Sequence, residues 1–235
     1  MQIVKPDIKS LNGNDSDIKS IYREDYTMTH EERSMKVADG LLSIKAVFFR
    51  PDDPFTWASG IKSPVYCDNR LTLTAPEVRT TIEEGFVELI KEYYPECEVL
   101  MGTSTSGIPH AAIIGHMMNL PMGYVRSGNK EHGRGNRIEG ALAKGAKVVV
   151  IEDLISTGGS CIEVVEALRE AGADVLGIAS IFTYNLKKGF DNLKAANAEN
   201  HSLTDFDMIA KRAAALNYVK EEEIESLIAF RNSLG

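Results

Sequence analysis

An acidic pair stands between an apolar run and a turn of small residues. The stretch KVVVIEDLISTGGS, residues 147–160, brings Glu152 and Asp153 directly after the apolar run. Leu154 and Ile155 then lead into the turn, which consists of Ser156, Thr157, Gly158, Gly159 and Ser160. Such a turn at the start of a helix binds phosphate, because backbone N–H groups, hydroxyls and the helix dipole all favour an anion there. The sequence therefore predicts a phosphate site with two carboxylates beside it.

The carboxylates need a task of their own, because they would otherwise repel the phosphate. Accepting hydrogen bonds from sugar hydroxyls and holding a divalent cation are the two chemistries that suit them. A sugar phosphate with a metal ion satisfies both. A glycine turn alone also fits an ordinary loop, but the spacing here matches neither the nucleotide-triphosphate P-loop nor the dinucleotide fingerprint.

A second segment concentrates positive charge. Residues 124–140 read YVRSGNKEHGRGNRIEG and include one acid, Glu131, before the closing IEG. Their basic side chains are Arg126, Lys130, His132, Arg134 and Arg137. Gly128, Gly133 and Gly135 disfavour a helix, and in an extended segment the first four basic residues project from one side. Such a loop can close over a diphosphate, stabilise it as a leaving group and exclude water; the alternative is a solvated surface hairpin.

The elements that position these residues follow from apolar periodicity. Helical spacing predicts helices at 30–44 and 76–94, the second stopped by Pro95. From Glu98 onward, four short apolar runs alternate with helical patterns, which is typical of a parallel sheet. Ligands bind outside the carboxyl ends of such strands, and the acidic pair follows a strand that we expect to be ending at Ile151. Two short helices are predicted between Leu203 and Arg231.

Composition limits the classes of function. The chain has 235 residues, 43% of them hydrophobic, and a formal net charge of −8. This acidity argues against a nucleic acid or a membrane surface as the main partner. Cys67, Cys97 and Cys161 are odd in number and lack metal-ligand spacing, so neither a disulfide framework nor a zinc cluster is predicted. We therefore expect the protein to work in a reducing cytoplasm. Neither a spanning apolar stretch nor a signal peptide is predicted.

The motifs resemble a known family. KVVVIEDLISTGGS is similar to the signature of type I phosphoribosyltransferases, which binds the ribose 5-phosphate of 5-phosphoribosyl 1-diphosphate. YVR, KEHGRGNRIEG, PFTWASGIKSPVYCDNRLTL (residues 54–73) and GTSTSGIPHAA (residues 102–112) narrow the resemblance to orotate phosphoribosyltransferases. The similar region covers about residues 46–182. The first 27 residues lie outside it.

The resemblance implies an α/β fold of the type I phosphoribosyltransferase class. This fold has a mainly parallel sheet flanked by helices, a small N-terminal substrate-side subdomain (the hood) and a flexible basic loop. We expect a loosely ordered extension at 1–27 and a single domain at 28–235. Within that domain we expect a hood segment at 28–75, a sheet core at 98–185 and C-terminal helices at 203–235.

The implied activity belongs to pyrimidine synthesis. Orotate and phosphoribosyl diphosphate give orotidine 5′-monophosphate and diphosphate, with Mg²⁺ bound mainly through the substrate's diphosphate and ribose and without a dedicated protein cage. The implied assembly is a cytoplasmic homodimer whose active sites are shared between subunits. By position, Arg126, Lys130 and His132 would stabilise the diphosphate from across the interface, and residues 152–160 would bind phosphoribosyl diphosphate. The implied orotate-binding residues are Ser156, Lys62, Tyr66 and Cys67.

Several positions depart from relatives that have lysine or arginine there. Ser127 and Gly128 stand in the basic loop, Ser106 in the diphosphate-side loop and Ala58 in the hood. The residues after Phe182 also lack an arginine that some members have. Two alternatives stay open: a phosphoribosyltransferase for another nucleobase, and a non-catalytic regulator on the same fold.

Overall fold

The computed structural model describes residues 28–50, 54–56, 60, 62–128 and 137–234. The helices are α2 (His30–Ser43), the 3₁₀ helix η2 (Asn69–Thr74), α3 (Pro76–Tyr93), α4 (Gly107–Met118), α5 (Gly159–Glu170), α6 (Lys187–Ala195), α7 (Phe206–Ala215) and α8 (Glu221–Ser233). The strands are β1 (Val47–Phe49), β2 (Phe55–Thr56), β3 (Lys62–Ser63), β4 (Val65–Cys67), β5 (Val99–Thr103), β6 (Met122–Val125), β7 (Ile138–Glu139), β8 (Lys147–Ile155), β9 (Asp174–Thr183) and β10 (Asn200–Asp205). Residues 1–27, predicted as an extension, lie outside this description.

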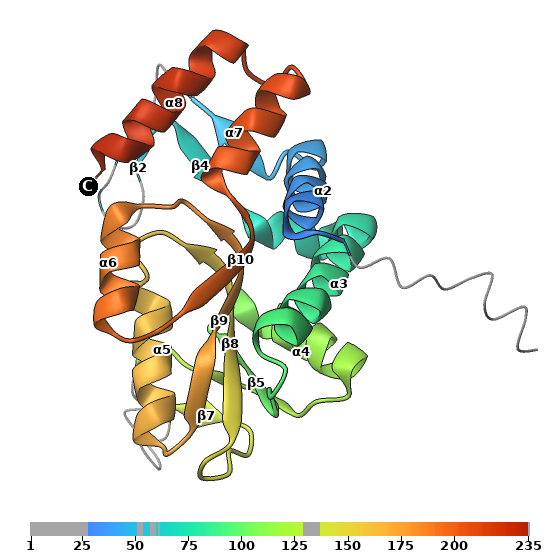
Figure 1. Ribbon diagram of the computed structural model, residues 1–235, viewed down its shortest axis with the longest axis vertical. Coiled ribbons are helices and arrows are strands. Elements are labelled where there is room, and N and C mark those ends of the chain that lie inside the picture. The colour runs from blue at the N-terminus through green and yellow to red at the C-terminus, as the bar shows by residue number, and fades with distance from the viewer. Residues whose placement is uncertain (1–27, 51–53, 57–59, 61, 129–136, 235) are drawn as a thin grey trace, which may run out of the picture.

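A six-stranded sheet in the order β10-β9-β8-β5-β6-β7 forms the centre of the molecule (Figure 1). All neighbouring pairs are parallel except β6 and β7, which are antiparallel. The predicted parallel sheet is therefore confirmed. The antiparallel pair at the edge brackets the segment that contains the basic loop, and Arg126 N–H donates to the Arg137 carbonyl at 2.9 Å to close its base.

Helices cover both faces of the sheet, with α3 and α4 on one side and α5 and α6 on the other (Figure 1). The side chains of β8 alternate between these two layers, as strand geometry requires. Val149 and Ile151 belong to the core beneath α3 and α4, whereas Val148 and Val150 belong to the core beneath α5. Because both faces are buried, β8 is apolar along its first half, which made it the clearest strand in the sequence.

A second, smaller layer stands at one end of the sheet. There β1 pairs with β4 and β2 pairs with β3, both antiparallel. The C-terminal helices α7 and α8 lie at the same end, and α2 contacts α7, so the N-terminal and C-terminal helices of the described chain pack together there (Figure 1). This layer faces the carboxyl ends of the parallel strands, the edge at which the acidic pair was expected.

The structure differs from the prediction between β9 and α7. Both predicted helices in 203–231 form, but the chain first makes α6 and then the edge strand β10. The strand was missed because it is polar: Ser180 on β9 hydrogen-bonds to Asn200 at 3.1 Å and to Ser202 at 2.7 Å. A strand held by such side-chain pairs shows no apolar alternation.

Strand β8 extends beyond the acidic pair. The strand covers the whole run KVVVIEDLI, as its apolar residues predict, and so continues past Ile151, where we expected it to be ending, to Ile155. Strand β5 pairs with β8 only as far as Ile151, whereas β9 pairs with it to the end. Residues 152–155 are thus held by β9 on one side and leave the β5 side open. The candidate site lies in this opening.

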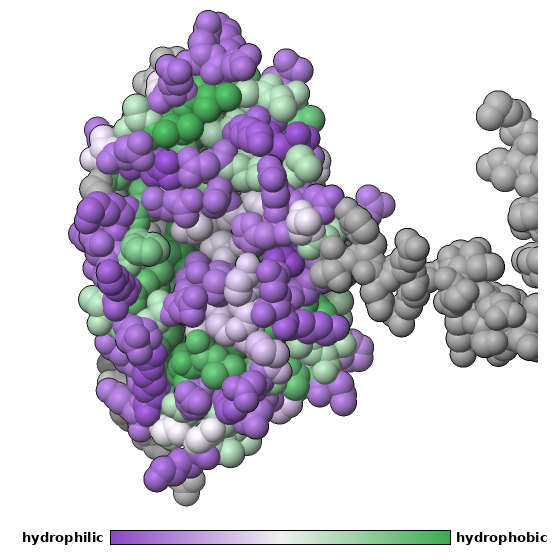
Figure 2. Space-filling model, in the orientation of Figure 1, coloured by the Kyte–Doolittle hydropathy of each residue, from purple (hydrophilic) through white to green (hydrophobic). Residues whose placement is uncertain are grey.

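The surface shown in Figure 2 is mostly hydrophilic, with hydrophobic side chains in separate patches. Among the described residues, no helix has both the length and the apolar character that a membrane crossing requires.

Candidate active site

A cavity of about 370 Å³ opens at the carboxyl ends of β5 and β8. Three segments of distant sequence meet there: residues 66–70 of the hood, residues 104–106 after β5, and the end of β8 with the turn that follows it. Tyr184, directly after β9, completes the wall. Of the predicted site residues, those that line the cavity are Tyr66, Cys67, Glu152, Asp153, Leu154, Ser156 and Ser160.

The two carboxylates differ sharply in environment. Glu152 is 4% exposed, and its Oε1 accepts hydrogen bonds from Thr103 Oγ1 at 2.7 Å and from the Asp153 N–H at 2.9 Å. Its Oε2 accepts from Ser160 Oγ at 3.3 Å. Burial, and next the charge of Asp153, raise the pKa of Glu152 to about 8. Asp153 is only partly buried and opens to the cavity.

The turn after β8 is shaped as an anion site. Gly158 has φ +78°, a left-handed conformation that glycine adopts without strain, and α5 begins at the next residue. The first N–H groups of α5 therefore point out of the helix end, next to the hydroxyls of the turn. Helix α6 holds the turn from behind: Asn192 Nδ2 donates to the Thr157 carbonyl at 2.9 Å. Cys161 behind the turn is buried, and burial raises the pKa of its thiol to about 12, so it is not a nucleophile.

The loop after β5 approaches β8 very closely. A Cβ atom on Gly107 would stand 2.2 Å from the Ile151 carbonyl oxygen and 2.6 Å from Thr103 Oγ1. Residue 107 must therefore be glycine for the loop Ser104–Ser106 to reach the cavity in this position. Ser104 Oγ anchors the loop to β6 by donating to the Val125 carbonyl at 2.7 Å.

Replacing Gly107 with alanine is expected to lower the free energy of unfolding by about 2–3 kcal/mol, because the new methyl group collides with backbone that cannot move freely. The matched control is Gly85→Ala inside α3, where the added Cβ meets side-chain atoms and no backbone, with Leu203 Cδ2 at 3.3 Å and Arg33 Cδ at 3.6 Å, and helix propensity improves. Urea unfolding monitored by circular dichroism measures both. A Gly107→Ala protein as stable as the Gly85→Ala protein would contradict the close approach.

The hood contributes the opposite wall and is bonded to the sheet. Asn69 Nδ2 donates to the Asp153 carbonyl at 2.7 Å, and the Cys67 N–H donates to Tyr184 Oη at 3.1 Å. Cys67 is buried, and burial strongly raises the pKa of its thiol, so the residue shapes the wall without reacting. The hood is thereby fixed over the acidic pair.

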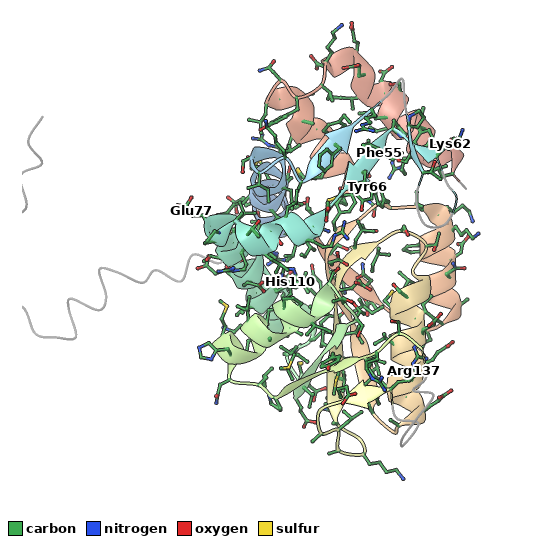
Figure 3. All side chains as sticks on the ribbon, turned by 180° about the vertical axis from the view of Figure 1, so that it is seen from behind. Phe55, Lys62, Tyr66, Glu77, His110 and Arg137 are labelled. Atoms are coloured by element: carbon green, nitrogen blue, oxygen red, sulfur yellow. The ribbon has the colours of Figure 1, made fainter. Side chains whose placement is uncertain are left out.

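Other predicted residues do not line this cavity. Lys62 lies on β3 at the outer part of the hood, with Tyr66 closer to the sheet (Figure 3). Arg126 stands at the base of the basic loop, with its Nε 3.0 Å from Glu139 Oε1. Lys130 and His132 lie outside the described residues. Four further predicted residues do not line the cavity: Ile155, the last residue of β8, and Thr157, Gly158 and Gly159 of the turn.

Sequence reasoning overlooked Thr103, Asn69, Arg70 and Tyr184. Thr103 is the second residue of GTSTSGIPHAA, and Asn69 and Arg70 lie within PFTWASGIKSPVYCDNRLTL, so membership of a motif was the available signal for these three. Their partners are far away in sequence: Thr103 and Glu152 are 49 residues apart, and Asn69 and Asp153 are 84.

The cavity suits a metal ion that arrives with its substrate. Within the described residues, no group of three or more His, Cys, Asp and Glu side chains could hold a metal ion. Mg²⁺ often takes one or two carboxylates together with substrate phosphates and water. Asp153, which opens to the cavity, fits that donor set, as do the oxygens that a sugar diphosphate would bring.

Comparison with known proteins places these features in a family. Residues 73–209 match the phosphoribosyl transferase domain. The chain is 56% identical over 198 residues to the orotate phosphoribosyltransferase of Bacillus anthracis, covering 84% of this chain and 94% of the relative. It is 58% identical over 192 residues to that of Listeria innocua, covering 82% and 92%. The structure of orotate phosphoribosyltransferase from Aeropyrum pernix superposes with a TM-score of 0.67 at 27% identity, covering 78% of this chain and 99% of that one. The chain belongs to the orotate phosphoribosyltransferase family.

Proposed function

We propose that this chain transfers the 5-phosphoribosyl group from phosphoribosyl diphosphate to orotate, giving orotidine 5′-monophosphate and diphosphate. One observation supports this most directly: the acidic pair with its hydroxyl turn, the loop 104–106 and the hood wall enclose a single cavity. A sugar phosphate, a diphosphate and a base are the three parts that such a cavity would hold side by side.

Each wall then has a part of the substrates to bind. The cradle 156–160 at the start of α5 holds the ribose 5-phosphate, and Glu152 with Asp153 accepts hydrogen bonds from the ribose hydroxyls. The diphosphate lies at the loop 104–106. Orotate lies against the hood wall of Tyr66 and Cys67, with Ser156 within reach of it.

The chemistry requires little covalent help. Breaking the bond between ribose C1 and the diphosphate creates an oxocarbenium-like centre, so the protein must place the orotate nitrogen in line, stabilise the departing oxygens and exclude water. Asp153, together with oxygens of the substrate, would hold Mg²⁺, which would supply positive charge to neutralise part of the diphosphate. Arg126, Lys130 and His132 of the basic loop supply the cations of the protein at the leaving group.

We propose further that the enzyme is a cytoplasmic homodimer in which the basic loop of one subunit completes the site of the other. Within the described residues that line the cavity, acids outnumber bases, with Asp68, Glu152 and Asp153 against Arg70. A diphosphate therefore needs cations from outside these walls.

The fall in orotate absorbance on mixing purified protein with orotate, phosphoribosyl diphosphate and Mg²⁺ tests the function, with adenine, guanine and uracil run in parallel. We expect turnover of orotate that stops when Mg²⁺ is chelated. Turnover of another base in place of orotate would overturn the base assignment, and inactivity with every base would favour a non-catalytic regulator.

A further inference from the structure

Orotate carries a carboxylate on the ring carbon next to the nitrogen that is ribosylated. If the proposed function is correct, that carboxylate must enter a cavity whose walls already hold the side chains of Asp68, Glu152 and Asp153. An anion placed among carboxylates is unfavourable unless a cation meets it. The base-side wall therefore needs a positive group.

Arg70 is the one basic residue among the described residues that line this cavity. The residues that line the cavity directly after strands β8 and β9 carry no positive charge, since Ser156 follows β8 and Tyr184 follows β9. Arg70 stands in η2, next to the hood wall of Tyr66 and Cys67. The position of this cation matches the side on which the base is expected.

The guanidinium of Arg70 is held by one edge and open at the other. Its Nε donates to Asp68 Oδ1 at 2.6 Å and its Nη2 donates to Asp68 Oδ2 at 2.8 Å. Nη2 also lies 3.4 Å from Tyr66 Oη, whereas Nη1 makes no hydrogen bond to the described residues. The side chain is 60% exposed. An arginine fixed in this way presents the edge of Nη1 and Nη2 to a ligand. Nη1 keeps both of its donors, and Nη2 would exchange its long contact with Tyr66 Oη, at 3.4 Å, for the second of two parallel hydrogen bonds to a carboxylate.

The pair with Asp68 does not remove this capacity. Hydrogen bonding to Asp68 and its charge raise the pKa of Arg70, so the guanidinium stays charged throughout the working range. Asp68 also fixes the rotamers of a long side chain, so less conformational entropy is lost when the ligand binds.

We propose that Arg70 binds the carboxylate of the pyrimidine substrate through its open edge, with Asp68 as the residue that orients it. Arg70 is then the group that distinguishes orotate from uracil, which lacks the carboxylate. Uracil would leave the guanidinium without its partner, and a site built to hydrogen-bond a group discriminates strongly against an analogue that lacks it.

Steady-state kinetics of the full chain test this, with Arg70→Ala and Arg70→Lys compared with wild type. Arg70→Ala is expected to lower kcat/KM for orotate by about 10- to 100-fold, since one charge-assisted contact is lost, with KM for phosphoribosyl diphosphate changed by less than about twofold. Arg70→Lys should recover part of the loss, because it restores the charge without the fork. The ratio of kcat/KM for orotate to kcat/KM for uracil should fall by a similar factor, because uracil lacks the carboxylate that Arg70 binds.

The matched control is Arg212→Ala. Arg212 makes the same pair of hydrogen bonds, to Asp39, at 2.6 and 2.8 Å, but it joins α7 to α2 away from the cavity. The Arg212→Ala substitution should leave the KM values for orotate and phosphoribosyl diphosphate unchanged. This result would separate a binding role of Arg70 from the general effect of losing an ion pair. The melting temperature of each variant shows whether it is folded.

Three outcomes would count against the inference. A folded Arg70→Ala enzyme that keeps kcat/KM for orotate within about threefold of wild type would overturn it. So would an equal loss for both substrates, which would indicate a structural role. A wild-type protein that does not turn over orotate would overturn the proposed function itself, and the inference with it.

Discussion

Replacing Glu152 with glutamine is expected to lower kcat/KM for phosphoribosyl diphosphate by roughly 100-fold at about pH 9, and by much less at about pH 6. The reason is the raised pKa of the buried carboxyl, about 8. Above this pH the carboxylate is ionised and accepts hydrogen bonds from ribose hydroxyls strongly. Below it the carboxyl is neutral and resembles the amide of glutamine, so the two enzymes should become similar.

The substitution is conservative in shape. Glutamine keeps an oxygen for the hydrogen bonds that Thr103 Oγ1 and the Asp153 N–H now donate to Oε1. Its amide N–H₂ can donate to Ser160 Oγ, which lies 3.3 Å from Oε2. The loss of rate should therefore come from the missing charge and not from a collapsed site.

The same variant should be more stable than wild type at high pH. The unfolded chain loses the Glu152 proton near pH 4.5, whereas the folded chain keeps it until about pH 8. Between these values the folded state binds more protons, so the free energy of unfolding of the wild type falls as the pH rises. This loss in the free energy of unfolding is absent below about pH 4.5 and complete above about pH 8. Glu152→Gln removes it, and we expect a gain on the order of 2 kcal/mol at about pH 9.

Rate profiles and thermal melts between about pH 6 and pH 9 measure both effects. Glu166→Gln, an exposed residue on α5, is the matched control and should follow wild type in both. Profiles of Glu152→Gln that remain parallel to wild type across this range would show that Glu152 does not titrate there.

The local features of this fold could be predicted because they depend on neighbouring residues. Helix α3 follows from apolar spacing with Pro76 in its first turn and Pro95 just beyond it. Strand β8 follows from a run that is buried on both faces. Edge strand β10 could not be predicted, because Ser180, Asn200 and Ser202 stabilise it with polar pairs in place of apolar ones.

The site shows the same division. The acidic pair and the turn after it were found from residue types and spacing, because phosphate binding needs a short contiguous segment. The long-range contacts of the site were not found, since Thr103 reaches Glu152 from 49 residues away and the hood contact of Cys67 with Tyr184 spans 117 residues. Such contacts exist only once the sheet order has brought β5, β8 and β9 together.

The second large effect concerns Lys130. Lys130→Ala is expected to lower kcat by about two to three orders of magnitude, because a charged contact made mainly in the transition state is worth about 2–4 kcal/mol. Single-turnover rates with saturating substrates measure it. Ser127→Ala in the same loop provides the control, because it removes no charge. Turnover by Lys130→Ala at the wild-type rate would exclude this residue from leaving-group stabilisation.

The same variant can show whether the basic loop acts in the active site of its own subunit or in that of its partner. The base of the loop lies beside the cavity of its own chain, since Ser104 Oγ donates to the Val125 carbonyl, so contiguity alone permits action within one subunit. Mixing Lys130→Ala and Glu152→Gln chains after unfolding and refolding them together, with activity assayed at about pH 9 where Glu152→Gln is impaired, distinguishes the two arrangements. If the loop acts across the dimer, each mixed dimer has one site with an intact loop and an intact acidic pair, and random mixing restores about a quarter of wild-type activity. If the loop acts within its own subunit, every site keeps one defect, and the mixture stays as inactive as its parts.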